Sequence, residues 1–295
     1  MLRRRTFLGL ILIAALVAAG CAGLAGRSSD RTGKVTVYLT DAPSDEIEQV
    51  WVTITGVHVH RDGSWHVLQD YSDAPLELDL LQLRFDSVLL GEALLPAGAY
   101  TQLRLIVDDS ATAKSHVVHR DGTITYLKVP SGAQTGLKIH HRFVVPADGS
   151  VELLLDANVL DFVHKAGNSE MYIMNPTAIR VVHREAAGII TGQVLGAPLE
   201  TSEPRPIADR RVTVTVELGT GEVVAQTLVL PEDEGHFQVN AVPAGVYTVI
   251  VAAENEGAEF AYESRIFTEV VVASGQETVL NGGEPIVLQA AARAR

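Results

Sequence analysis

The chain has 295 residues, and its 36 acidic residues against 23 Lys and Arg give a net charge of −13 at pH 7. This balance argues against a nucleic-acid-binding protein, because such proteins neutralise phosphates with clustered basic residues. The hydrophobic fraction of 47% can fill substantial cores, and the length favours two domains.

Residues 1–20 have the layout of a secretory signal. Three arginines, Arg3–Arg5, precede an apolar run from Phe7 to Ala19. The run is too short to span a bilayer comfortably, which takes about 20 apolar residues. The segment ends in Ala18-Ala19-Gly20-Cys21, which resembles a lipobox, with Ala18 where leucine is usual. The resemblance implies that lipid is attached to the thiol of Cys21.

Cys21 is the only cysteine, so the exported protein can form no internal disulfide. Lipidation gives this lone cysteine a role in an oxidising compartment, and an ordinary signal peptide with an incidental cysteine is the alternative. Arg4-Arg5-Thr6-Phe7-Leu8 also resembles the twin-arginine consensus, which leaves the export route open. By resemblance to enteric sorting rules, Ala22 favours the outer membrane or cell surface over the inner membrane. We therefore expect a cell-envelope protein held to a membrane through Cys21.

After removal of the signal segment, the first half of the chain is predicted to consist of a tether followed by a β-rich domain. Removing residues 1–20 leaves 36 acidic and 20 basic residues, a net charge of −16. Residues 21–33 are rich in Gly and Ser without periodicity, which predicts a flexible tether. Period-two alternation predicts strands in a domain over 34–186, at 35–39, 51–55, 57–60, 102–107 and 137–139. Residues 76–95 are the main helical candidate, although their leucines also fit a strand.

A second domain is predicted over 187–295. Seven short strands with Gly and Pro between them indicate a Greek-key sandwich. They are expected at 188–194, 212–218, 223–230, 236–239, 247–252, 266–272 and 277–280. The predicted fold class is all-β, with two β-sandwiches in tandem, the second seven-stranded and prealbumin-like.

One short motif occurs in both halves. Pro96-Ala97-Gly98-Ala99-Tyr100 is repeated as Pro243-Ala244-Gly245-Val246-Tyr247. Each is a turn that leads into a strand, and tyrosine corners are a device of sandwich folds. We expect each tyrosine ring to pack inward and each hydroxyl to bond back to its turn.

Both halves resemble known families. The segments 33–43, 50–60, 95–107 and 137–155 together resemble a bacterial lipoprotein domain of unknown function (number 4382 of that series). That family commonly has an Asp-Phe-Asp-Ala cluster near its end, of which Leu155-Asp156-Ala157-Asn158 keeps part. The second half resembles the carboxypeptidase regulatory-like, transthyretin-type sandwich in Gly192-Gln193-Val194, Gly235-His236-Phe237 and the segment 242–247. That resemblance implies a non-enzymatic module with Phe237 and Tyr247 in its core.

Metal binding is one alternative. His58 and His60 share one face of a predicted strand, and His66 follows the Asp62-Gly63 turn, so three imidazoles could converge on zinc or copper. A solvated strand face is the simpler interpretation, and no metal is assigned.

An acidic cluster follows the first predicted strand. Asp41, Asp45 and Glu46 lie close together in the sequence but lack the pattern of a calcium-binding loop. Asp41 is expected to cap a turn at Ser44–Gln49 instead.

No catalytic motif is present in the sequence, and no cofactor is expected. We therefore predict a non-catalytic binding or scaffolding module of the cell envelope, with an unidentified glycan or envelope protein as its possible partner. The alternatives are a carbohydrate-binding lipoprotein that uses the C-terminal sandwich and an envelope metal-binding protein. For sugar contact, Trp65, Phe260 and Tyr262 are the candidate rings, whereas Trp51 is expected in the core.

Overall fold

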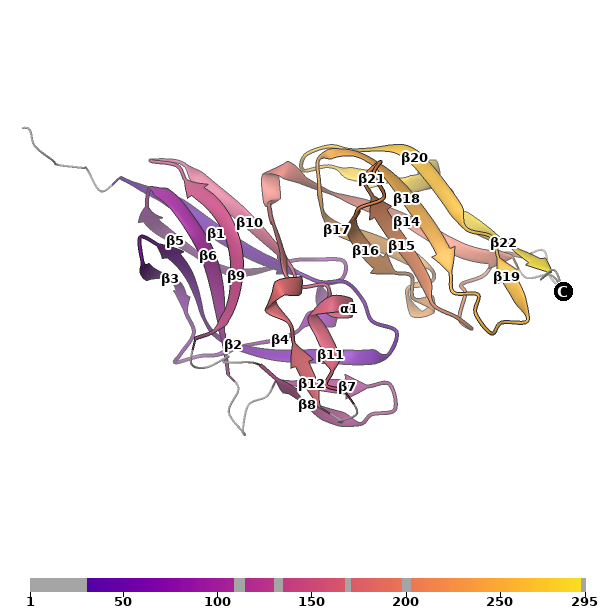
Figure 1. Ribbon diagram of the computed structural model, residues 1–295, viewed down its shortest axis with the longest axis horizontal. Coiled ribbons are helices and arrows are strands. Elements are labelled where there is room, and N and C mark those ends of the chain that lie inside the picture. Colours follow the sequence, from indigo (N-terminus) through magenta and orange to yellow (C-terminus); the bar gives the residue numbers. More distant parts are fainter. Residues whose placement is uncertain (1–30, 109–114, 130–134, 168–170, 198–202, 293–295) are drawn as a thin grey trace, which may run out of the picture.

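The computed structural model describes residues 31–108, 115–129, 135–167, 171–197 and 203–292. The chain forms two β-sandwich domains in tandem along its long axis (Figure 1). One hydrophobic core runs from Val35 to Ile179 and the other from Ile190 to Leu288. The prediction of an all-β fold with two sandwiches is confirmed. Cys21 and residues 18–20 lie outside the described residues, and no helix in the described ranges is long and apolar enough to cross a membrane.

The first sandwich packs a small sheet against a large one. The small sheet has the order β13 (Arg180–His183), β10 (Ser150–Asp156), β1 (Thr32–Thr40), β5 (Val88–Pro96). The large sheet has the order β11 (Val163–Lys165), β12 (Tyr172–Met174), β8 (Ile124–Lys128), β7 (His116–His119), β2 (Ile47–Arg61), β6 (Gly98–Val107), β9 (Leu137–Val145). β3 (Ser64–Asp70) and β4 (Leu76–Asp79) also pair with β2, which is long enough to hold both.

The helix expected over 76–95 is absent. The segment forms β4, a 3-10 turn at Leu80–Leu83 and then β5. Asp79 explains the break, because its Oδ1 accepts hydrogen bonds from the backbone N–H groups of Leu81 (3.2 Å) and Val50 (3.0 Å). A side chain that caps the turn and also binds a neighbouring strand ends β4 at that residue.

The second sandwich has nine strands within the described residues, two more than predicted. One sheet has the order β17 (His236–Pro243), β14 (Ala187–Ala197), β22 (Ile286–Ala292), β19 (Phe260–Tyr262), with β21 (Glu277–Val279) also on β14. The other has the order β16 (Val223–Leu228), β15 (Val212–Glu217), β18 (Gly245–Ala253), β20 (Arg265–Val272). The unpredicted strands are β19, which is only three residues long, and β22, which ends in alanines that give no alternation. Phe237 and Tyr247 are core residues, as expected.

The repeated Pro-Ala-Gly motif forms the same corner in both domains. Tyr100 donates its hydroxyl to the carbonyl of Pro96 (3.0 Å), and Tyr247 donates to that of Pro243 (2.8 Å), as the sequence predicts. Each corner carries the chain from one sheet of its sandwich to the other, from β5 to β6 and from β17 to β18. The two motifs therefore have one structural role.

The backbone around the corners repeats as well. The N–H of Ala97 donates to the carbonyl of Arg31 (2.7 Å), just as that of Ala244 donates to Ala186 (2.9 Å). In both domains the first strand lies antiparallel to the strand before the corner and parallel to a later strand, β10 in one and β21 and β22 in the other. The two domains thus share a structural frame that the sequence reveals only at the corner.

Loss of one corner hydroxyl is expected to destabilise its own domain. Tyr100→Phe keeps the buried ring but leaves the Pro96 carbonyl without its partner, which costs about 1 kcal/mol of unfolding free energy. Both tryptophans, Trp51 and Trp65, lie in the first domain, so tryptophan fluorescence during urea unfolding reports on that domain. Tyr247→Phe is the matched control, since it removes the same bond from the other domain. A larger shift for Tyr247→Phe than for Tyr100→Phe would contradict this assignment.

Candidate functional site

Within the described residues, three arginines form ion pairs between the two sandwiches. In each, a guanidinium of one domain meets a carboxylate of the other, and two of the pairs are bidentate, which fixes orientation as well as distance. The pairs are Arg84 with Asp233 (3.0 and 2.8 Å), Arg211 with Asp45 (2.7 and 2.8 Å) and with Glu46 (3.6 Å), and Arg120 with Glu232 (2.8 Å). They connect the two domains through three separate arginine side chains.

Arg180 lies at the centre of this junction. Its Nη2 donates to Oδ2 of Asp156 in its own domain (2.6 Å) and to the carbonyl of Asn240 in the other (3.0 Å). Its Nη1 donates to the carbonyl of Val224. One guanidinium therefore joins a buried carboxylate to two strands of the second sandwich, β16 and β17.

Asn240 completes the contact from the opposite side. Its Nδ2 donates to the carbonyls of Asp41 and Arg84, both at 3.1 Å. Its Oδ1 accepts from Nε2 of Gln238 (2.7 Å), so the orientation of its amide is fixed by three partners. The side chain is buried, and hydrogen bonding offsets the cost of taking the amide out of water.

Two carboxyl groups are buried beneath the junction. Burial raises the pKa of Asp156, although the Arg180 guanidinium partly opposes that rise. Asp41 is 0% exposed, and burial raises its pKa well above the ordinary value even though the backbone N–H groups of Ala42 and Val159 favour its charged form. Its Oδ2 is buried without a hydrogen-bond partner among the described residues. Asp41 is therefore costly to ionise.

The roles expected for the acids near Asp41 need correction. Its Oδ1 accepts from the N–H of Val159 (2.8 Å), so it caps the short helix α1 (Val159–Phe162) and not the turn after Ser44. Ser44 caps its own turn, accepting from the N–H of Ile47 (3.2 Å). Asp45 is committed to its ion pair across the junction. Sequence reasoning missed both roles because the partners lie more than 100 residues away along the chain.

A groove of about 600 Å³ lies beside the junction and is lined by both domains. Among the described residues that line it, the charged ones are mainly acidic: Asp86, Glu152, Glu185 and Glu277, with Arg184 as the single cation. Arg184 is held by Glu152 (3.4 Å), and its guanidinium carbon lies 4.0 Å from the centre of the Tyr38 ring. A polar ligand in this groove would touch both sandwiches at once.

The groove wall includes one strained backbone position. Ala241 has φ of +54° and is buried, and the pairing of β17 with β14 shifts register beside it. A non-glycine residue in this conformation costs about 1 kcal/mol or more. The bulge turns β17 so that Asn240 reaches the first domain.

The structure does not bring the three candidate metal ligands together. Val59 of β2 pairs with His66, whereas His58 and His60 pair with Val67 and Trp65. Directly paired residues share a face and successive residues alternate, so His66 points to the core face, where its ring meets that of Tyr100 (5.9 Å). The described residues contain no group of three His, Cys, Asp or Glu side chains placed to hold a metal ion.

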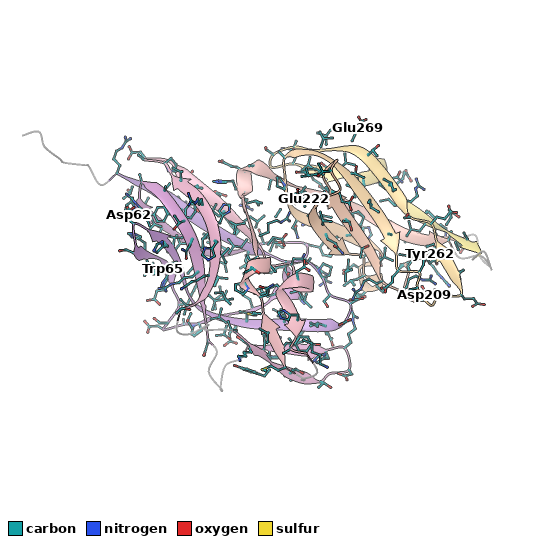
Figure 2. All side chains as sticks on the ribbon, viewed as in Figure 1. Asp62, Trp65, Asp209, Glu222, Tyr262 and Glu269 are labelled. Carbon is teal, nitrogen blue, oxygen red and sulfur yellow. The ribbon has the colours of Figure 1, made fainter. Side chains whose placement is uncertain are left out.

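The aromatic rings expected to contact sugar differ in how far they are exposed and in which domain they lie. Tyr262 is only 6% exposed, and Arg210 stacks on both it and Phe260, so neither ring in the second sandwich is freely presented. Trp51 is half-buried rather than fully in the core, and its ring stacks on that of His116 (6.3 Å). Trp65 lies on the outer face of the first sandwich, away from the second domain (Figure 2).

Residues 32–176 match the family model described as "Domain of unknown function (DUF4382)". A domain of this family is therefore found in the first half, where the sequence resembles it. The match includes Asp41 and Asp156, so both buried carboxyl groups of the junction belong to the matched segment. The resemblance of the second half to the carboxypeptidase regulatory-like family stays a prediction. A search of curated proteins finds no match to this sequence.

Several solved structures align with the chain at low similarity. The minor pilin GBS52 of Streptococcus agalactiae is 9% identical, with a TM-score of 0.26 over 88% of this chain and 98% of that one. The Bacillus anthracis TIE protein is 11% identical, with a TM-score of 0.23, and the chain spans about a third of its length, 34%. Two B repeats of the Staphylococcus aureus collagen-binding protein are 11% identical, with a TM-score of 0.23 over 88% of this chain and 49% of that one.

The junction is expected to show measurable coupling. In a double-mutant cycle, Arg84→Met and Asp233→Asn should be non-additive by about 1 kcal/mol in urea unfolding, because both side chains are largely buried and the pair is bidentate. Arg31 and Asp148 form the matched control pair, since they lie within one domain and are 56% and 68% exposed. Their cycle should give coupling close to zero, and equal coupling in the two cycles would count against a special role for the junction pair.

The pH dependence of stability should report on Asp41. Its pKa is raised in the folded protein, so between the ordinary value near 3.8 and the folded value the folded chain holds a proton that the unfolded chain releases. Stability is then lost as pH rises through this window. Asp41→Asn should remove that part of the decline, seen in the unfolding free energy by tryptophan fluorescence from about pH 4 upward.

Asp121→Asn is the control for this measurement. Hydrogen bonds from Thr123 lower the pKa of Asp121, so its contribution changes only below the ordinary carboxyl range. The variant should keep the decline of the wild type above that range. If the Asp41→Asn variant also keeps the decline in stability, the carboxyl group of Asp41 is not the source of that decline.

Proposed function

We propose that the chain is a cell-envelope lipoprotein whose two sandwiches act as one non-catalytic unit for binding or scaffolding. The observation that carries this proposal is the junction, where the interdomain ion pairs of three arginines accompany the Arg180 and Asn240 contacts. Independent modules on a flexible connection would not need this number of directed polar contacts, each of which orders side chains at an entropic cost.

The arrangement of the chain ends suits a tethered unit. β1 begins at the end of the molecule that lies away from the second domain, and β22 runs to the opposite end (Figure 1). A lipid on Cys21 would therefore anchor the first domain and hold the second domain farther from the membrane. Several acyl chains on one cysteine would hold the protein far better than the marginal binding of a single chain.

The anchor is tested by metabolic labelling with radioactive palmitate in a bacterial host. The wild type should be labelled and sediment with membranes, whereas Cys21→Ser should lose the label because no thiol remains to be acylated. Ala22→Asp is the matched control one residue away, and it should keep the label while its distribution between membranes changes. Undiminished labelling of Cys21→Ser would refute the anchor.

The unit itself is tested in solution by small-angle X-ray scattering. If the junction is fixed, the radius of gyration should be the same at low and high protein concentration. The scattering curve calculated from this one structure should also fit the measured curve. The variant with Arg84→Met, Arg120→Met and Arg211→Met removes the arginine of every interdomain ion pair among the described residues and should raise the radius of gyration. A wild-type curve that requires an ensemble of domain orientations would contradict the scaffold proposal.

A further inference from the structure

The outer face of four strands in the first sandwich carries an ordered array of side chains. Backbone register places them in two rows that cross β3, β2, β6 and β9, because directly paired residues share a face. One row consists of Val67, His58, Arg104 and Lys138; the other consists of Trp65, His60, Gln102 and His140. Inward neighbours such as Val59, Leu103 and Ile139 are buried, which confirms that the array faces outward.

The array contains no carboxylate, although the chain as a whole has an excess of acids. The nearest acids along β2 and β3 lie at the rim and are engaged locally. Asp62 pairs with Arg61 (2.9 Å), and Asp70 accepts from the N–H of Ser72 (2.9 Å). This face therefore carries positive charge, although the protein as a whole has a net negative charge.

Arg104 is held in place without a carboxylate partner in the described part of the chain. Its Nε and Nη2 both lie within bonding distance of Nδ1 of His58 (3.2 and 2.9 Å), and its Nη1 donates to the carbonyl of Thr135 (3.4 Å). Its guanidinium carbon lies 4.2 Å from the centre of the Trp65 ring. Neutral partners fix the cation and leave its charge uncompensated, which is the arrangement expected of a preorganised anion site.

The two rows differ in chemistry. The first supplies the cations Arg104 and Lys138, whereas the second supplies the hydrogen-bonding side chains of His60, Gln102 and His140 around an indole. The rows are two residues apart along each strand, about 7 Å. A polymer that lies across the strands would thus meet charge on one side and donors and acceptors for hydroxyl groups on the other.

We propose that this face binds a polysaccharide that carries carboxylate groups. Carboxylates would pair with Arg104 and Lys138, while sugar hydroxyls would bond to His60, Gln102 and His140. The inference specifies the ligand class for the proposed binding role and moves carbohydrate recognition from the second sandwich to the first. It does not depend on the lipid anchor.

Other polyanions fit this face less well. Single-stranded nucleic acid is bound by stacking successive bases on several rings, and this array has one tryptophan whose face Arg104 already occupies. A membrane surface would favour inserted apolar side chains, of which the array offers Val67 and the Trp65 ring that Arg104 covers.

The test measures binding of the purified full-length protein to polygalacturonate by isothermal titration calorimetry. Dextran serves as the uncharged polysaccharide, and single-stranded DNA and phosphatidylglycerol vesicles represent the other polyanions. Polygalacturonate should bind, dextran should bind much more weakly, and added salt should weaken the interaction. No preference for polygalacturonate over dextran, or a preference for DNA or vesicles over both, would overturn the proposal.

Variants test the location of the site. Lys138→Gln and Arg104→Lys should each weaken polygalacturonate binding by about tenfold, the first by loss of charge and the second by loss of the planar fork. Lys128→Gln is the matched control, because Lys128 is also exposed on a strand of this sheet but lies outside the array. Unchanged thermal unfolding establishes that each variant folds.

Equal weakening by Lys128→Gln and Lys138→Gln would indicate general attraction to the protein and would overturn the proposed site. The palmitate labelling of Cys21 and the scattering of the junction variants do not involve these residues. Failure of the polysaccharide test is therefore distinguishable from failure of the anchor or of the scaffold.

Discussion

The contact of Arg180 with Asp156 and with the second sandwich is the interaction on which the two-domain arrangement depends. Asp156 is buried, so an unpaired charge there would cost several kcal/mol. The partner that neutralises it comes from β13, the last strand of the first sandwich, and the same guanidinium donates across the junction. The requirement to satisfy a buried carboxylate thus also positions the donors that bind the second domain.

The charges around this contact are complementary across the boundary. Arg84 and Arg120 of the first domain face Asp233 and Glu232, which lie in one 3-10 turn before β17, while Arg211 of the second domain faces Asp45. Because the chain is strongly acidic, a few arginines placed at the boundary reduce repulsion between the two domains where they approach. Bidentate geometry at two of these pairs then selects one orientation.

The two sandwiches have the same arrangement of corner and first strand, but the side chains on their outer faces differ. The tyrosine corner and the hydrogen bonds around the first strand recur in both, which shows that this frame tolerates different outer faces. In the first domain the outer face of β3, β2, β6 and β9 carries cations and an indole. In the second, paired residues on β18 and β20 such as Val246 and Val271 are exposed and apolar. The two domains therefore present chemically different outer faces on a common frame.

The sequence alone determined the all-β class, two sandwiches and both tyrosine corners, because alternation and turn residues act over short stretches of chain. It also locates the lipidation motif at Cys21, which stays a prediction. Only the tertiary structure decided the rest. His66 pairs with Val59, the residue between His58 and His60, and therefore lies on the opposite face of the sheet from them. Asp41 caps a helix 118 residues away along the chain, and Asp45 forms its ion pair with a residue 166 positions away. Such pairings depend on how distant strands are aligned, and local sequence patterns carry no information about that alignment.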